Sequence, residues 1–280
     1  MKFGINTLLW TAAFDREHLP LLARIKSWGF DGVEVARFDF AGFRAVEIRR
    51  ALADHGLGVT GCSALTGDLS FTSDDAAVRT RARDFMKSAI EATAELGAAV
   101  LVGPYVSPVG YLSGKRRTDS EWSHAVEELS ALGPVLDAHN VLLAVEPLNR
   151  FECHTLNTTA DARRLCDAVS NPRVGILFDT FHANIEEKSV GAAVESLGKH
   201  LKHVHTCEND RGIPGSGHVD WAGLFAALGR MNYDQWIVIE SFGSRIPEIA
   251  AAACIWRDLA PEADLIARDG LKFLRCIARR

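Results

Sequence analysis

The stretch Val141-Leu142-Leu143-Ala144-Val145-Glu146 consists of five apolar residues followed by a carboxylate. An unbroken apolar run of this length, without alternating polar residues, is typical of a parallel strand that is covered on both faces. The same arrangement recurs at Val174–Asp179 (VGILFD) and at Trp236–Glu240 (WIVIE). These stretches predict a parallel sheet with helices packed around it.

Strand patterns of this kind alternate with amphipathic stretches along the whole chain. Strands are expected at Lys2–Leu9, Gly32–Ala36, Gly58–Cys62, Ala98–Gly103, Val141–Pro147, Val174–Asp179, Leu201–Thr206 and Trp236–Glu240. Helices are expected at Glu17–Trp28, Gly42–His55, Asp74–Leu96, Asp119–His139, Thr159–Val169, Val190–Leu197 and Asp220–Leu228, and in two pieces after Ile246, broken near Pro261.

This alternation in 280 residues predicts an α/β fold, the closed (β/α)₈ or TIM barrel, with an extra C-terminal helix. A doubly wound open sheet is the alternative, but the first strand is not followed by the glycine-rich phosphate loop of that fold. No linker or break in composition divides the chain, so we expect a single domain over residues 1–280.

Composition and charge exclude several classes of protein. The formal net charge is −5 and no basic run is present, so we expect no nucleic-acid partner. The N-terminus shows no signal peptide and no apolar run would span a membrane, so we expect a cytoplasmic protein without a membrane partner. The six cysteines are scattered without a CxxC pair and are expected to be reduced thiols.

Four consecutive strands end in, or carry near their ends, a polar side chain: Glu146, Asp179, His205 and Glu240. Any one of them alone is more often a helix cap or a solvated loop residue. A barrel, however, keeps its active site at the C-terminal ends of its strands, where these four side chains would meet. Three carboxylates and one imidazole at one point suit Mn²⁺, Mg²⁺ or Co²⁺, with Zn²⁺ as a further candidate.

Further polar residues lie in the loops beyond these strand ends. His182 follows Asp179 by three residues and is either a donor or acceptor for a sugar oxygen or a residue of a helix N-terminus. Glu208 is either a site residue or a surface charge. The glycine-rich segment 212–217 is either a mobile lid or a turn. His203, two residues before His205, is expected to point to the opposite side of the strand from His205 and to be structural.

Trp10 and Phe14, after the first strand, are either an apolar wall of the pocket or ordinary packing residues.

With these motifs the chain resembles the D-tagatose 3-epimerase and D-allulose (psicose) 3-epimerase family, within the xylose isomerase-like barrel superfamily. The most specific matching segments are EPLNRFE at 146–152 and DTFHANIEE at 179–187. Looser matches are 205–211, the turn 214–217, 239–242 and 256–258, so the resemblance extends over the whole chain.

The resemblance implies which residues form the site. Metal ligands would be Glu146, Asp179, His205 and Glu240, usually around manganese. Glu146 and Glu240 would also be the catalytic acid and base. Substrate contacts would be Glu152, His182 and Arg211, near O1 and O2 of the sugar, and Cys62 would line the pocket. A small-molecule sugar substrate and a homodimer or homotetramer are also implied.

The implied activity is epimerisation at C3 of free ketohexoses and ketopentoses of the D-tagatose, D-allulose/D-fructose and L-ribulose type. Two alternatives stay open: an aldose–ketose isomerase similar to hydroxypyruvate isomerase, and a metal-dependent lyase of the inositol-derivative dehydratase type. Pro147 stands where valine is usual in the family, and the loop at 103–108 lacks the expected aromatic pattern. The preferred sugar therefore stays open.

Overall fold

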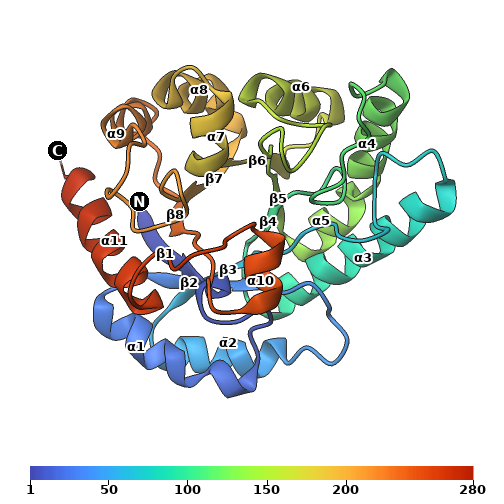
Figure 1. The fold of residues 1–280 in the computed structure, drawn as a ribbon. Helices are drawn as coiled ribbons and strands as arrows, with labels where there is room; N and C mark the ends of the chain where they lie inside the picture. The colour runs from blue at the N-terminus through green and yellow to red at the C-terminus, as the bar shows by residue number, and fades with distance from the viewer. Residues whose placement is uncertain (280) are drawn as a thin grey trace.

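The computed structural model describes residues 1–279 as a closed barrel of parallel strands surrounded by helices (Figure 1). Each strand pairs with the next in the chain, and β8 pairs with β1 to close the ring. The strands are β1 Lys2–Asn6, β2 Gly32–Ala36, β3 Gly58–Cys62, β4 Val100–Gly103, β5 Leu142–Val145, β6 Val174–Asp179, β7 Leu201–Thr206 and β8 Trp236–Ile239. The predicted (β/α)₈ barrel is confirmed; Arg280, the last residue of the expected domain, lies outside the described residues.

Most of the helices form an outer layer around the strands (Figure 1). They are α1 Pro20–Trp28, α2 Ala45–Asp54, α3 Ala76–Glu95, α4 Asp119–Ala131, α5 Gly133–His139, α6 Thr159–Val169, α7 Thr180–Glu186, α8 Val190–Leu197, α9 Trp221–Arg230, α10 Pro247–Ala252 and α11 Ala263–Ile277. Short 3₁₀ turns lie at Thr7–Leu9, Arg16–His18 and Gly198–His200. Within residues 1–279, no helix combines the length and the apolar character needed to cross a membrane.

Two elements differ from the sequence-based expectation for identifiable reasons. The first strand stops at Asn6, because the Asn6 side chain accepts a hydrogen bond from the backbone N–H of Leu8 and caps the 3₁₀ turn that follows. The single helix expected at Asp119–His139 is two helices, α4 and α5, with Pro134 in the first turn of α5. Proline lacks the N–H that would continue the earlier helix.

The chain after β8 forms two helices with different positions, as the break near Pro261 predicts. The longer helix, α11, packs against α9 and β8 and so takes the eighth position in the outer layer. Its buried side includes Ile266, Leu271 and Leu274. The shorter helix, α10, lies in front of the strands in Figure 1, and its Ile249 lines the cavity at the barrel mouth. The segment 241–262 therefore forms part of the site.

Candidate active site

The four polar side chains at consecutive strand ends come together at the barrel mouth. Glu146 follows β5, Asp179 ends β6, His205 lies in β7 and Glu240 follows β8, and all four are buried. One potential ligand atom from each lies within 4.8 Å of the others. His205 Nδ1 is 3.3 Å from Glu240 Oε2 and 3.8 Å from Asp179 Oδ2. The structure thus brings together all four residues that the strand ends predicted.

The surroundings of this cluster shift the pKa values of its members in different directions. Burial, together with the charges of Glu240 and Asp179, raises the pKa of Glu146 well above its usual value. Burial also disfavours the charged form of Asp179, but the guanidinium of Arg211, together with His205 and His182, outweighs burial and holds the pKa of Asp179 well below its usual value. Burial disfavours the His205 cation, but the carboxylates around it, Glu240 foremost, raise its pKa. Without a metal, the cluster therefore tends to retain protons on Glu146 and His205.

Two atoms of the cluster lack a hydrogen-bond partner within the described residues. They are Glu146 Oε1 and His205 Nδ1, and both are buried. A buried polar atom without a partner costs about 1–3 kcal/mol. Both atoms belong to the same four-residue group, and a divalent cation would satisfy them together. Oxygen-rich donor sets with one imidazole suit Mn²⁺, Mg²⁺ or Co²⁺, so the residues present fit such an ion.

Arg211 contributes a buried positive charge beside the cluster. It lies in the loop after β7 with a φ of 65°, in the left-handed region that non-glycine residues rarely occupy. Its Nη1 donates to Asp179 Oδ2 and to Glu240 Oε2, both at 2.9 Å. The guanidinium carbon lies 4.2 Å from the ring centroid of Phe181 and 4.7 Å from that of Phe242. Two carboxylates and two aromatic rings therefore fix the position of Arg211.

Hydrogen bonds to a buried carboxylate, Glu208, hold the loop that carries Arg211 in place. Its side chain accepts hydrogen bonds from the backbone N–H groups of Gly215 and Val219, at 2.7 and 3.0 Å, and from the indole N–H of Trp221 at 3.0 Å. Glu208 is therefore not a surface charge. Since its contacts tie the turn at 214–217 to the start of α9, the structure supports the turn interpretation of this segment.

The protonation of the His182 ring follows from its neighbours. Its Nδ1 lies 3.0 Å from the backbone N of Asn149 and 2.9 Å from the side-chain Nδ2 of the same residue. The Asn149 side-chain oxygen accepts from the N–H of Phe151, so it is the amide nitrogen that faces the ring. Nδ1 is faced by two donors and must be the acceptor, which leaves the proton on Nε2. Burial lowers the pKa of His182 and favours this neutral form.

The protonated Nε2 of His182 lies among the reactive groups. It is 3.5 Å from Glu146 Oε1, which can accept its proton, and 3.1 Å from Nη2 of Arg211, an obligate donor that cannot hydrogen-bond to this tautomer. The second residue held by Asn149 is Glu152, whose Oε1 accepts from the Asn149 amide at 2.7 Å. Asn149 therefore orients His182 and Glu152 together, and sequence analysis did not single it out.

One cavity of about 310 Å³ connects these groups. Its lining includes Cys62, Glu146, Glu152, His182, Arg211 and Glu240. Every residue expected to contact substrate, and both residues expected to act as acid and base, thus border one space. Asp179 and His205 are buried behind it.

The rest of the wall is mostly apolar, with Phe38 and Phe242 among its residues. Trp10 and Phe14 are packing residues instead. The Trp10 indole donates to Asp264 Oδ1 of α11 at 2.9 Å, and Phe14 is fully buried in the core.

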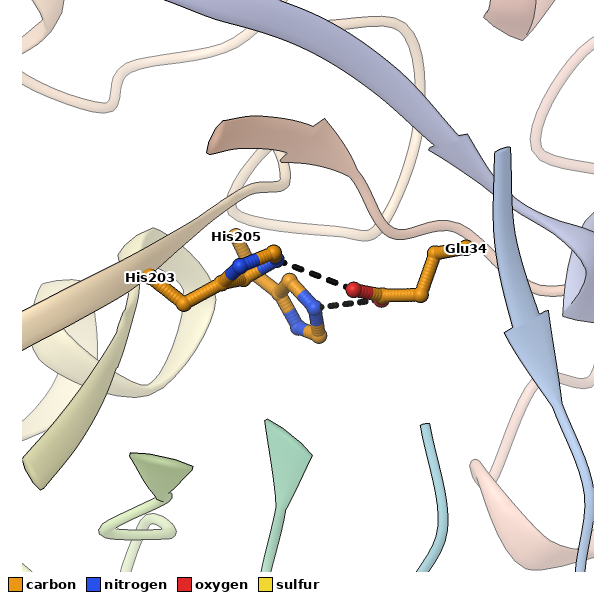
Figure 2. A group of neighbouring side chains, drawn as sticks. All are labelled: Glu34, His203 and His205. Carbon is orange, nitrogen blue, oxygen red and sulfur yellow. Dashed lines mark hydrogen bonds and ion pairs between the residues drawn. The ribbon is translucent and has the colours of Figure 1, made fainter. Parts of the chain in front are cut away.

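The prediction that His203 lies on the opposite side of β7 from His205 is wrong. Alternation along a strand places residues i and i+2 on the same side, so His203 and His205 share an orientation. Figure 2 shows both imidazoles facing Glu34, a residue of β2 that sequence analysis did not single out. The signal that could have revealed Glu34 is a lone charge within the apolar run Gly32-Val33-Glu34-Val35-Ala36.

The closed barrel and the carboxylate–histidine cluster at its strand ends define the class of protein, a TIM-barrel enzyme of the xylose isomerase type. A family model described as "Xylose isomerase-like TIM barrel" matches residues 22–276. A protein of Synechocystis sp. named "Probable ketose 3-epimerase" is 38% identical over 275 residues, which cover 98% of this chain and 96% of the relative.

Solved structures agree with this match. The "Structure of L-ribulose 3-epimerase" superimposes with a TM-score of 0.95 at 29% identity, covering 99% of this chain and 94% of the other. A D-allulose 3-epimerase from Methylomonas sp., in complex with D-allulose, gives a TM-score of 0.93 at 26% identity and covers 99% and 96% of the two chains. The chain belongs to the ketose 3-epimerase family and is a carbohydrate isomerase.

Proposed function

We propose that this protein is a divalent-metal-dependent ketose 3-epimerase that interconverts the C3 epimers of free ketohexoses and ketopentoses. The substrates would be sugars of the D-tagatose, D-allulose/D-fructose and L-ribulose type. The observation that carries the proposal is that Glu146 and Glu240 border one cavity and both belong to a four-residue cluster that fits a metal. The names of the relatives support the reaction.

Epimerisation beside a ketone requires that a proton leave one face of the carbon and another arrive on the opposite face. One fixed base cannot serve both faces, whereas two carboxylates across the reacting carbon can. In the closed barrel β6 and β7 separate β5 from β8, so Glu146 and Glu240 approach the cavity from different sides. We assign them the roles of acid and base, which they exchange when the reaction runs in the other direction.

The proposed metal ligands are Glu146, Asp179, His205 and Glu240. Mn²⁺ is the ion we propose, with Mg²⁺ and Co²⁺ as alternatives, because all three accept oxygen-rich donor sets. A bound divalent cation would act as a Lewis acid toward the negative charge that develops on the sugar oxygens. Asp179 reaches the cluster through Oδ2 only, since its Oδ1 accepts from the N–H of Phe181 and caps α7.

The other polar residues of the cavity supply complementary contacts for a sugar. His182 presents an Nε2–H donor, Arg211 presents N–H donors, and the Glu152 carboxylate is an acceptor. We propose that these three hold oxygens next to the reacting carbon. Burial raises the pKa of Cys62 well above its usual value, so Cys62 would line the pocket as a neutral thiol.

Free sugars fit this cavity better than phosphorylated ones. Among the described residues that line it, Arg211 is the only cation, and two carboxylates already engage its guanidinium. A phosphate group would need additional donors or positive charge. The apolar part of the wall offers neither.

A panel of free ketoses incubated with the protein and Mn²⁺ tests the proposal. The expected result is formation of the C3 epimer of at least one ketohexose or ketopentose, detected by chromatography. Formation of an aldose instead would identify an aldose–ketose isomerase, and loss of water would identify a lyase. Either result without C3 epimerisation would refute the proposal.

We further propose a homodimer or homotetramer. Two large aromatic side chains support this, because Phe151 is 71% exposed and Trp256 is 77% exposed. Exposed aromatic residues are enriched at protein interfaces. Sedimentation analysis tests this directly, and a monomer at all concentrations would refute it.

A further inference from the structure

A second group of buried polar residues lies in the barrel interior and shares His205 with the site. Glu34 of β2 is fully buried and faces two imidazoles of β7 (Figure 2). Glu34 Oε1 is 2.7 Å from His205 Nε2, and Glu34 Oε2 is 2.9 Å from His203 Nε2. The opposite nitrogen of His205, Nδ1, faces Asp179 and Glu240. One ring of His205 therefore joins the inner group to the candidate metal site.

Two further contacts define how Glu34 is held. Its Oε1 accepts from Asn6 Nδ2 at 2.9 Å, and its Oε2 accepts from the Thr60 hydroxyl at 2.9 Å. The Asn6 side-chain oxygen accepts from the N–H of Leu8, so its amide nitrogen must be the atom that faces Glu34. This contact is compatible only with an acceptor oxygen on Glu34.

Both oxygens of Glu34 thus face donors, the Asn6 amide at Oε1 and the Thr60 hydroxyl at Oε2, which is the surrounding that an ionised carboxylate requires. An ionised carboxylate accepts hydrogen bonds and donates none. The proton between Glu34 and His205 therefore lies on Nε2 of the imidazole.

We infer that Glu34 is a positioning residue, which holds His205 in the orientation and tautomer that present the Nδ1 lone pair to a divalent cation. The inference rests on the metal site of the proposed function and deepens it. A neutral imidazole carries one proton, so a hydrogen bond from Nε2 leaves Nδ1 as the only ligating nitrogen. A carboxylate behind a ligating imidazole also raises its basicity toward the metal.

The geometry disfavours the alternative in which Glu34, His203 and His205 hold an ion of their own. His205 would then have to bind one cation through Nε2 and the other through Nδ1, which requires an imidazole without any proton. Both oxygens of Glu34 also accept from Asn6 and Thr60 already. Hydrogen bonding accounts for Glu34 and for Nε2 of His205 without a second ion, whereas the two ring nitrogens of His203 have no hydrogen-bond partner among the described residues.

His203 provides a matched control, because it touches the same carboxylate without facing the four-residue cluster. Its Nε2 lies beside Glu34 Oε2, whereas His205 lies beside Oε1. A change at His203 perturbs the packing of the inner group but leaves the contact between Glu34 and His205 intact.

The experiment compares Mn²⁺ binding, by titration calorimetry or by the electron paramagnetic resonance signal of free Mn²⁺, in four proteins. They are the wild type, Glu34→Gln, His203→Gln and His205→Gln, each checked for folding by circular dichroism. Glu34→Gln is expected to weaken Mn²⁺ binding by about 10–100-fold. His203→Gln is expected to bind close to the wild-type affinity, and His205→Gln is expected to lose most binding.

A second measurement reads the tautomer directly. In ¹⁵N-histidine-labelled protein saturated with diamagnetic Mg²⁺, His205 of the wild type is expected to show the Nε2–H form, and Glu34→Gln is expected to lose it. An Nδ1–H form of His205 in the wild type would overturn the inference even if the variant failed to fold.

The outcomes separate this inference from the proposed function. Wild-type affinity and an unchanged tautomer in Glu34→Gln would overturn the inference and leave the metal site intact. Wild-type affinity in His205→Gln would instead refute the metal site. Two tightly bound ions per chain, one of them lost in His203→Gln, would overturn the inference by showing a second ion site.

Discussion

The backbone N–H of Asn149 donates to Nδ1 of His182 over 3.0 Å. This contact makes Nδ1 an acceptor, so the proton of the neutral ring is on Nε2. The side-chain amide of Asn149 approaches the same nitrogen at 2.9 Å, so both donors act in the same direction. His182 therefore offers a hydrogen-bond donor to the cavity, where it can polarise a sugar oxygen without acting as a base.

Replacing Asn149 by Asp should change the charge state of His182. Burial lowers the pKa of His182, so the ring is neutral at and above neutral pH. A carboxylate at the position of the amide would favour the cation and shift the pKa of His182 upward. We expect kcat/KM to fall and the nuclear magnetic resonance titration of His182 to move to higher pH.

The control for this variant is Asn184→Asp, which places the same charge on α7, the helix that carries His182, but next to His218 instead. It should leave the titration of His182 close to that of the wild type. An unchanged titration of His182 in Asn149→Asp would show that Asn149 does not determine its charge state.

Glu240→Gln should abolish turnover while the fold stays intact, because an amide cannot exchange the proton. Loss of general acid–base catalysis reduces rates by about 10²–10⁴-fold. The measurement is kcat for the preferred ketose, with circular dichroism to confirm folding. Glu248→Gln alters an exposed glutamate of α10 at the same cavity and should retain near-normal turnover. Near-normal epimerisation by Glu240→Gln would remove Glu240 from the acid–base pair.

The two-base assignment also predicts the pattern of hydrogen exchange in heavy water. Wild-type protein should place deuterium at C3 of the product epimer. Glu240→Gln keeps Glu146, so it should exchange the C3 proton of one epimer without inverting that carbon, and should not exchange that of the other. Mass spectrometry and proton spectra of the recovered sugars measure this. Equal exchange of both epimers by the variant would point to a single mobile base.

Removal of the metal should abolish activity, and Mn²⁺ should restore it. Added Mn²⁺ at 100 times its dissociation constant should stabilise the fold by about 2.7 kcal/mol, measured by thermal unfolding. Because the pKa of Glu146 is raised, an incoming cation has to displace a proton. Mn²⁺ affinity should therefore increase with pH until Glu146 is ionised in the free protein. Full activity after exhaustive chelation would exclude a metal requirement.

Glu208→Gln should destabilise the protein without touching the cavity. Each carboxylate oxygen of Glu208 accepts from two N–H groups, so the amide nitrogen of Gln would face two donors. Buried donors left unpaired cost about 1–3 kcal/mol each. Chemical denaturation should show the loss, together with a rise in KM if the loop that carries Arg211 shifts. Unchanged stability would show that the loop is held by other contacts.

The barrel and its four-residue cluster could be predicted because they depend on local patterns. Apolar runs determine the strands, and the end of each run identifies a residue at the barrel mouth, as with Glu146 and Asp179. Glu34 and Asn149 escaped prediction because their importance lies in contacts with His205 and His182, 171 and 33 residues away in sequence. His203 was misplaced through the strand period itself, since two residues span one full alternation.

Because of the position of helix α10, the choice of substrate and the proton transfer depend on different parts of the chain. The reacting groups sit on or next to strands whose hydrogen bonds close the ring, whereas α10 belongs to a connection outside that ring and contributes Ile249 and Ala252 to the wall. Changes in the length or sequence of 241–262 therefore alter which molecules enter while the strand register is preserved. This connection can therefore vary in evolution without changing the barrel. A mutant library confined to Pro247–Ala252 should change which sugars are accepted, while the same residues carry out the proton transfer.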